Sequence, residues 1–435
     1  MGRRQIEIGL AGLGNVGMGV YANLQKNSAL LSRRCQADLN VRRIAVRDKS
    51  KARDREVPET LLTDRWQDIV DDDAIDVVVE LIGGIEQAKE LVIAALRRKK
   101  VVVSGNKALL AEHGPEIFAL AEEMEVPVYF EAAVAGGIPI IKALQESLVG
   151  NAIRVISGII NGTCNYILTR MREEGLSYQD ALKEAQALGY AESDPTLDVN
   201  GWDAGHKAVL LASLACGRWA AADQIHVEGI EGIRLSDIRF VETLGYAVKL
   251  LAVIRCGCDE GPLEVRVQPC LVPKSHLLAS VNGVFNAVMV EGDLVGETLF
   301  YGSGAGQDPT SSSVIADLVD AAVGLQHEEK RGYIPSNELA EVKPIGETVS
   351  QYYLRLTVEN RPGVLAQIAQ IAASHEIGIM SVIQPESTAA MADLVLMLDH
   401  APYGSVQNAL REIRALPCTT DNTTLLRMES FEESA

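Results

Sequence analysis

The sequence predicts an α/β protein that begins with a doubly wound parallel sheet and continues into α+β structure. A glycine-rich loop at 9–17 joins a short apolar strand at 6–10 to a helix at 18–25. Strands then alternate with helices of about 10–15 residues as far as residue 131, which is the pattern of consecutive βαβ units. The segment 351–430 is predicted to run β-α-β-β-α-β and to form a small module of its own.

The glycine-rich loop has the spacing G-x-G-x-x-G at Gly12, Gly14 and Gly17. The first glycine allows a sharp turn, the second lets the main chain approach a pyrophosphate, and the third permits close packing of helix on strand. The N-terminus of the following helix then offers free N–H groups to the anion. The loop therefore predicts dinucleotide binding, and a glycine-rich turn without a ligand is the alternative.

The end of the second predicted strand, 39–46, bears on the choice of dinucleotide. An acidic residue at this place prefers a free ribose 2′-hydroxyl, whereas an arginine accommodates a 2′-phosphate. The chain offers both, as Arg47 and Asp48. Arg47 falls at the strand tip and Lys49 and Lys51 add positive charge, so NADP is favoured over NAD. The alternative is that these are solvated turn residues.

Composition narrows the class of protein. The 435 residues correspond to roughly two to four domains, and no apolar run is long enough for a membrane span. We expect no signal peptide, because the first strand follows Met1 almost at once. The net charge of −19 argues against nucleic acid or an anionic membrane as partner, since both require positive surface. Seven dispersed cysteines suit a reducing compartment, so we expect a cytoplasmic protein acting on small molecules.

Lys107 is the first candidate for chemistry. It follows the predicted strand 101–104, at the carboxyl edge of the sheet where open α/β proteins bind ligands. Further strands are predicted at 75–81 and 126–131, and further helices at 86–99 and 112–124. A lysine at the start of a helix is also a common surface residue, and this alternative stays open.

The segment 189–207 is the richest in ionisable groups. Asp203 and Lys207 are four residues apart in a predicted helix at 202–216, so they share a face. This spacing is also that of an ordinary solvated ion pair. The helix continues as a nearly apolar run, however, so a lysine entering it beside carboxylates is a candidate acid/base group. The carboxylates Glu192 and Asp198 would suit a substrate with an ammonium group.

A cysteine supplies a rival mechanism. Cys164 lies in a small polar turn after a predicted strand at 153–161, where Asn161 is expected to cap a helix reaching Glu174. A thiol there could act as a nucleophile on an aldehyde. No histidine lies near it in the sequence, so a structural cysteine is the favoured interpretation.

The combined motifs resemble those of homoserine dehydrogenases, and the resemblance covers nearly the whole chain. It is carried by the segments 9–17, 78–84, 106–109, 131–139, 161–167, 188–195, 198–207 and 301–306. The resemblance implies an oxidoreductase acting on a CH–OH group, which reversibly reduces L-aspartate 4-semialdehyde to L-homoserine in threonine, methionine and isoleucine biosynthesis.

Roles follow from this resemblance residue by residue. Lys207 would donate the proton to the aldehyde oxygen and Lys107 would assist near nicotinamide and substrate, while Asp203 would orient Lys207. Substrate would be held by Glu192, Asp198, Asp203 and Lys107. The cofactor would be bound by Gly12, Gly14, Asn15, Val16, Gly17, Arg47, Ile82, Ser104, Lys107, Gly189, Gly304 and Gly306. A monovalent cation, sodium by resemblance, would be held by Glu131, Val134, Gly136 and Ile138.

The same resemblance suggests an arrangement of domains. A Rossmann-type NAD(P)-binding domain would span 1–140 and be completed by about 302–325, ahead of a helix that Ser311 would cap. A catalytic and dimerisation domain would span 141–301. A polar linker at 326–350 would lead to the module at 351–430.

The C-terminal module resembles an ACT domain through Asn360-Arg-Pro-Gly-Val-Leu365. Such modules pair with copies of themselves and commonly bind amino acids, so we expect a homodimer or homotetramer with L-threonine as a possible inhibitor. A module that only mediates oligomerisation is the alternative. Two other classes of function also stay open: a non-catalytic amino-acid or nucleotide sensor, and a semialdehyde dehydrogenase that depends on Cys164.

Overall fold

The computed structural model describes residues 3–52, 55–257, 261–327, 334–384 and 389–431. The chain divides into two compact units, and each is built from segments that are distant in the sequence. Unit 1 comprises Met1–Ile160, His206–Asp223 and Asn286–Glu341, and unit 2 comprises Asn161–Gly205, Gln224–Phe285 and Val342–Ala435. The domain boundaries expected from the sequence stay a prediction.

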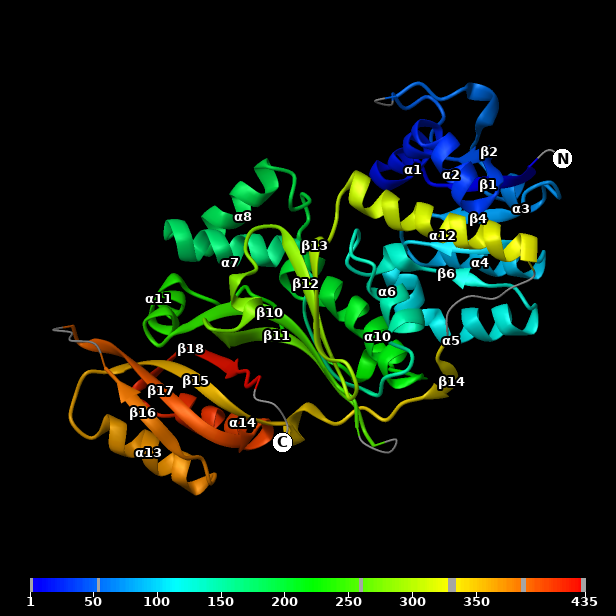
Figure 1. Ribbon diagram of the computed structural model, residues 1–435. Coiled ribbons are helices and arrows are strands. Elements are labelled where there is room, and N and C mark those ends of the chain that lie inside the picture. Colours follow the sequence, from blue (N-terminus) through cyan, green and yellow to red (C-terminus); the bar gives the residue numbers. More distant parts are fainter. Residues whose placement is uncertain (1–2, 53–54, 258–260, 328–333, 385–388, 432–435) are drawn as a thin grey trace. The chain divides into compact units, whose positions relative to one another are not determined.

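Among the described residues of unit 1, six strands form a parallel sheet in the order β3-β2-β1-β4-β5-β6 (Figure 1). They are β1 (Arg4–Ala11), β2 (Ala37–Ala45), β3 (Leu62–Thr63), β4 (Val77–Glu80), β5 (Val101–Ser104) and β6 (Val128–Tyr129). β4 and β5 are buried along their whole length, as an apolar run in a covered parallel sheet should be. The predicted doubly wound parallel sheet is confirmed.

The helices of this sheet fall into two groups by their mutual contacts. One group is α1 (Asn15–Lys26), α2 (Ser28–Cys35) and α12 (Gln307–His327); the other is α3 (Gln67–Val70), α4 (Glu86–Arg97) and α5 (Lys107–Glu123). Figure 1 shows α12, in yellow, beside α1, although the two are nearly 300 residues apart in the chain. The expected return of the chain near 302–325 thus adds a helix to this sheet.

Two helix starts differ from the expected ones. α5 begins at Lys107 and not near 112, because the Asn106 side chain accepts the Leu109 N–H at 3.1 Å and caps the helix. α12 begins at Gln307, so Ser311 lies inside the helix, fully buried, and is not its cap. The predicted cap at Ser311 was therefore wrong, because the glycine-rich turn at Gly304–Gly306 already ends one residue before the helix.

The rest of unit 1 packs beside the sheet. An antiparallel group is formed by β7 (Ile153–Ile159), β12 (Phe285–Gly292) and β13 (Gly296–Ser303). The predicted helix towards Leu148 is α6 (Ile140–Lys142) followed by a π-helical turn at Ala143–Ser147. A short pair, β8 (Arg218–Trp219) and β14 (Ser336–Leu339), lies partly within the segment expected as a linker, of which 328–333 are outside the described residues.

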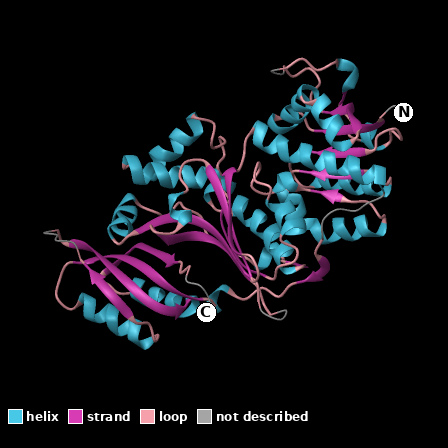
Figure 2. Cartoon of the chain, viewed as in Figure 1, coloured by secondary structure: helices cyan, strands magenta, loops and turns pink. Residues whose placement is uncertain are grey.

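Unit 2 contains a mixed sheet in the order β10-β11-β18-β15-β17-β16, with β9 paired to β11 (Figure 2). Its strands are β9 (His226–Val227), β10 (Tyr246–Arg255), β11 (Glu264–Pro273), β15 (Val349–Glu359), β16 (Ile379–Ile383), β17 (Met391–Pro402) and β18 (Thr419–Met428). Its helices are α7 (Gly162–Glu174), α8 (Tyr178–Ala187), α9 (Thr196–Val199), α11 (Leu235–Thr243), α13 (Val364–Ser374) and α14 (Tyr403–Arg414). Helix α10 (Trp202–Cys216) starts in unit 2 and continues into unit 1.

The C-terminal elements follow the predicted β-α-β-β-α-β order from β15 to β18, with residues 385–388 outside the described part. Their core is a single cluster that includes Leu354, Ile368, Leu396 and Leu410. β18 also pairs in parallel with β11, where Cys270 lies opposite Arg427. The module's sheet is therefore continuous with β10 and β11, a connection that the sequence does not reveal.

Two buried ion pairs strengthen this connection within unit 2. Arg355 of β15 binds Asp237 of α11, and both side chains are almost completely buried. Arg266 of β11 binds Glu429, the residue after β18, at 2.7 Å. Breaking one partner of such a pair leaves a buried charge uncompensated, which is strongly destabilising. No helix in the described part of the chain is long and apolar enough to cross a membrane.

Candidate active site

A cavity of about 600 Å³ opens in unit 1 beyond the carboxyl ends of β1, β2 and β4. Its walls include the glycine loop after β1, the turn after β2, and Leu81 and Ile82 after β4. The sheet order reverses at β1 and β4, and this switch point is where open α/β sheets bind ligands. The cavity therefore lies where a dinucleotide is expected.

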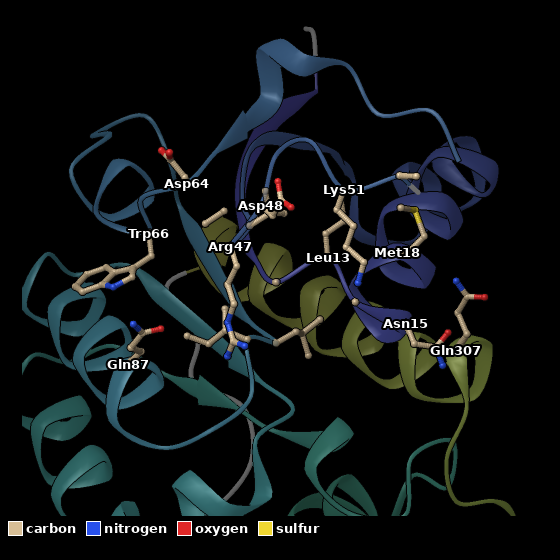
Figure 3. Close-up of a pocket in the computed structure, with 17 residues that line it drawn as sticks. Leu13, Asn15, Met18, Arg47, Asp48, Lys51, Asp64, Trp66, Gln87 and Gln307 are labelled. Carbon is tan, nitrogen blue, oxygen red and sulfur yellow. The ribbon is translucent and has the colours of Figure 1, made fainter. Parts of the chain in front are cut away.

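Positive side chains line this cavity on the side of β2. Figure 3 shows Arg47 and Lys51 extending into it, with Asn15 on the side of α1. Asp48 also lines the cavity, but its Oδ1 accepts the Ser50 N–H at 2.8 Å and the Ser50 hydroxyl at 2.6 Å. The carboxylate therefore closes its own turn, whereas the guanidinium of Arg47 faces the cavity.

The glycines of the loop are required by close approach of the main chain. Gly12 has φ +100°, and a Cβ there would overlap the Leu81 carbonyl. A Cβ at Gly17 would overlap the Gly12 carbonyl, so α1 can pack on the loop only without one. Gly14 differs, since a Cβ there would meet nothing within 4 Å and would point into open space. Gly12 and Gly17 are thus required by the fold, whereas no part of the protein excludes a Cβ at Gly14.

The buried carboxylate of Glu80 hydrogen-bonds residues at the ends of β4 and β5. Glu80 ends β4 fully buried, accepts the Ser104 hydroxyl at 2.6 Å, and accepts the Ile82 N–H at 3.1 Å. Burial raises the pKa of this carboxyl, and the hydrogen bonds oppose the shift. Glu80 therefore joins Ile82 and Ser104, two predicted cofactor residues, and Ser104 in turn accepts the Asn106 N–H beside Lys107.

The two candidate lysines of unit 1 differ in burial. Lys107 is the first residue of α5 and is partly exposed. Lys207 is 9% exposed, and its Nζ donates to the main-chain carbonyl of Ile160 at 2.8 Å. A neutral carbonyl orients the amine without neutralising it, which suits a group that must give up and regain a proton.

The predicted cation loop lies in unit 1 after β6. Both carboxylate oxygens of Glu131 accept main-chain N–H groups, from Ile141 at 3.0 Å and Lys142 at 2.8 Å. Burial raises the pKa of Glu131 to about 7, which these bonds oppose. The Glu131 carboxylate thus holds the start of α6, and its role as a cation ligand stays a prediction. Ala135 has φ +53°, which turns the main chain sharply between Val134 and Gly136.

A second segment packs against this loop. A Cβ at Gly136 would overlap the Gly304 carbonyl, and the Ser313 hydroxyl donates to the Gly136 carbonyl at 2.5 Å. Gly304 and Gly306 lead directly into α12, whose first residue, Gln307, lines the cofactor cavity. The structure therefore brings the cation loop, the Gly304–Gly306 turn and the cavity together within unit 1. Ile138 is buried in the same loop.

Two of the three predicted substrate carboxylates meet in unit 2. Asp198 of α9 and Asp203 of α10 both accept from the Nδ2 of Asn161, at 2.8 and 2.9 Å. Glu192 is exposed in the turn after α8, and among the described residues only its main-chain carbonyl is hydrogen-bonded, to Gln186. Gly189 lies near it in unit 2. Asp203 and Lys207 are one turn apart in α10, as expected.

Comparisons with known proteins identify the family. A family model for "Homoserine dehydrogenase" matches residues 139–319, and one for "Homoserine dehydrogenase, NAD binding domain" matches residues 12–131. The homoserine dehydrogenase of Neisseria gonorrhoeae is 44% identical over 99% of this chain and 100% of its own. The chain belongs to the homoserine dehydrogenase family.

Solved structures agree with this assignment. A homoserine dehydrogenase from Thiobacillus denitrificans superimposes with a TM-score of 0.91 at 43% identity, covering 99% of each chain. A hyperthermophilic archaeal homoserine dehydrogenase in complex with NADPH gives a TM-score of 0.62 at 26% identity, over 75% of this chain and 99% of that one. The chain is thus an NAD(P)-dependent oxidoreductase with a nicotinamide cofactor.

Membership of the homoserine dehydrogenase family removes the sensor alternative, and the structure weakens the thiol alternative. Cys164 is completely buried at the start of α7, and its Sγ donates to the Asp198 carbonyl at 3.1 Å. Its position serves packing between α7 and α9. The sequence predicts no functional role for Glu80 or Gln307, and for Asn161 it predicts only a helix cap. A carboxylate at the end of an otherwise apolar strand was the one signal that could have indicated Glu80.

Proposed function

We propose that this homoserine dehydrogenase interconverts L-aspartate 4-semialdehyde and L-homoserine, with NADP as its preferred cofactor. The observation that carries the proposal is the position of Lys207. It is buried on the same helix as Asp203, and its Nζ donates to the main-chain carbonyl of Ile160. In the direction of reduction, a bound nicotinamide cofactor would supply a hydride for the aldehyde carbon. Lys207 supplies the proton to the aldehyde oxygen, and the alcohol leaves.

The remaining side chains would bind and orient. Asp198 and Asp203 would bind the ammonium group of L-homoserine or L-aspartate 4-semialdehyde. Glu192, which is exposed, would also contribute negative charge. Lys107 would assist near the nicotinamide, since it follows the turn that Glu80 organises at the carboxyl edge of β5. The reverse reaction uses the same groups, with Lys207 accepting the proton.

The preference for NADP rests on Arg47, which extends into the cavity while Asp48 is engaged by Ser50. Gly12, Gly14, Asn15, Val16 and Gly17 would hold the pyrophosphate at the start of α1. The test is the steady-state rate of L-homoserine oxidation with NADP and with NAD. A KM for NADP that is lower than the KM for NAD supports the proposal. A KM for NADP that is equal to or higher than the KM for NAD contradicts it.

Oxygen atoms of residues 131–138 are proposed to bind a monovalent cation. The Glu131 carboxylate and the main-chain carbonyls of Val134, Gly136 and Ile138 would be hard oxygen ligands. The left-handed turn at Ala135 and the bonds from α6 to Glu131 support this role. The cation would stabilise the turn at Ala135 and Gly136, which packs against Gly304. Titration of the affinity for NADPH in sodium and in choline chloride tests this, and identical affinities in the two salts would contradict it.

The C-terminal module is proposed to bind L-threonine as an inhibitor and to pair with a second copy of the chain. A cavity of about 360 Å³ lies at the start of α13, lined by residues 358–365 together with Gln384 and Leu394. Inhibition by threonine of L-homoserine oxidation supports the role of effector. A rate that threonine leaves unchanged supports oligomerisation alone. A cytoplasmic location is part of the proposal.

A further inference from the structure

Asn161 connects two carboxylates that belong to different helices. It lies between β7 and α7 and is 3% exposed. Its Nδ2 donates to Asp198 Oδ1 at 2.8 Å and to Asp203 Oδ2 at 2.9 Å. Its Oδ1 accepts the Cys164 N–H at 2.7 Å. One side-chain amide therefore caps a helix and bridges two acidic groups at once.

The orientation of this amide is determined by the helix cap. The Cys164 N–H is a donor, so the atom facing it has to be the amide oxygen, and the NH₂ group then faces the carboxylates. The NH₂ group has two hydrogens, and each is directed to one carboxylate. The Cys164 Sγ also donates to the main-chain carbonyl of Asp198, so α7 holds α9 by a second bond.

The segment between the two carboxylates is also constrained. Gly201 has φ +89°, and a Cβ there would lie 3.0 Å from Val227 Cγ1 and 3.1 Å from the Glu228 carbonyl. The Asn200 side chain accepts the Trp202 N–H at 3.0 Å, which closes the turn into α10. Asp198 and Asp203 thus have fixed main chains, and Asn161 sets the direction of their side chains.

We infer that Asn161 is a positioning residue, which holds Asp198 and Asp203 together so that both can face one substrate ammonium group. Neighbouring carboxylates repel each other, and the NH₂ group of Asn161 offsets this repulsion by donating to both. The inference rests on the proposed roles of the two aspartates in binding substrate.

Asn161→Asp is the sharpest variant, because it removes the donor and keeps the shape and the helix cap. Aspartate is as good an N-cap as asparagine, so α7 should remain intact. The new carboxylate would face two others, so we expect the KM for L-homoserine to rise about tenfold or more at pH 8. The affinity for NADPH, measured by fluorescence, should stay within about twofold, since its cavity lies in unit 1.

The pH profile separates positioning from a structural role. In Asn161→Asp, protonation of one of the three carboxyls restores a donor, so the KM defect relative to the wild type should shrink as the pH falls towards 6. Asn161→Ser keeps a capping oxygen but adds no charge, so its smaller KM defect should not depend on pH. Ser177→Asn, at the cap of α8, is the matched control and should leave both KM values unchanged.

The outcomes distinguish this inference from the proposed function. If Asp198→Asn and Asp203→Asn raise the KM for homoserine but Asn161→Asp does not, Asn161 is only a helix cap and the inference is wrong. If the two aspartate variants leave the KM unchanged, the proposed substrate roles are wrong. If Asn161→Asp does not fold, Asn161→Ser is the test in its place. A KM for L-homoserine in Asn161→Ser equal to that of the wild type overturns the inference.

Discussion

The cofactor loop and the carboxylate cluster are built in opposite ways. The loop consists of consecutive main-chain groups at 9–17, and its glycines are required because a Cβ at Gly12 or Gly17 would overlap a carbonyl. The cluster consists of charged side chains from α9 and α10, held by an amide 37 and 42 residues earlier in the chain. A recognition site made of main chain is sensitive to one added methyl group, whereas a cluster of side chains is sensitive to charge.

The largest effect is expected at the acid/base group. Lys207→Ala should lower turnover by about two to four orders of magnitude, because Lys207 is the group proposed to move the proton. The measurement is kcat for homoserine oxidation at saturating NADP and homoserine. NADPH affinity and the melting temperature serve as controls for folding. Near-normal kcat would show that the proton moves elsewhere.

The glycine loop allows a matched pair of variants. Gly12→Ala should destabilise the protein by about 1–3 kcal/mol and weaken NADP binding, because its positive φ and the Leu81 carbonyl both oppose a Cβ. Gly14→Ala should leave the melting temperature unchanged and weaken NADP binding alone, since its Cβ meets nothing in the protein but lies in the wall of the cavity. Equal destabilisation by both variants would contradict this division of roles.

A buried lysine in unit 2 should make stability depend on pH. Lys249 is 1% exposed and hydrogen-bonds Asn165 Oδ1 at 3.1 Å and the Val281 carbonyl, and burial lowers its pKa to about 7. Between pH 7 and its unfolded pKa of 10.5, the unfolded state binds this proton and the folded state releases it. The contribution of Lys249 to the free energy of unfolding should therefore rise with pH, by about 1 kcal/mol per unit above pH 7.

Lys249→Met tests this contribution by removing the titrating group at similar volume. The difference in unfolding free energy between the wild type and Lys249→Met, from urea titrations at pH 7, 8 and 9, should move in favour of the wild type as pH rises. A difference that is constant with pH would mean that Lys249 is protonated when folded. The glycine loop contains no ionisable side chain and contributes no such slope.

The smallest effect is expected at the ribose end of the cavity. Arg47→Ser should raise the KM for NADP by about tenfold and leave that for NAD within about twofold, because the guanidinium is proposed to meet only the 2′-phosphate. The ratio of kcat/KM for the two cofactors is the measurement. A parallel loss with both cofactors would assign Arg47 to the fold of the cavity wall.

The same contrast explains what could be predicted from the sequence. The alternation of strands and helices, the glycine loop, Arg47 at the end of a strand and the Asn161 cap are local patterns, in which neighbouring residues determine the result. The link from Asn161 to Asp203, the buried Glu80 beneath Ser104, and Gln307 in the cavity wall depend on contacts between distant segments. Spacing along the chain carries no information about such contacts.

The start of a helix and the pairing of two strands also could not be predicted from the sequence. The predicted helix at 112–124 begins too late, because the Asn106 side chain caps the helix and determines where it starts. The parallel pairing of β18 with β11 joins the C-terminal module to the preceding sheet, and the two strands are about 150 residues apart in the chain. Expected boundaries in this region rested on composition, which does not report strand pairing.

The central claim is that cofactor and substrate recognition have separate physical origins, and a pair of variants tests it directly. Gly14→Ala and Asn161→Asp are measured together for NADPH affinity by fluorescence and for the KM of L-homoserine at saturating NADP. The account predicts that Gly14→Ala weakens only NADPH binding, that Asn161→Asp raises only the homoserine KM, and that the double variant shows both effects unchanged. A single variant that alters both quantities by similar factors would contradict it.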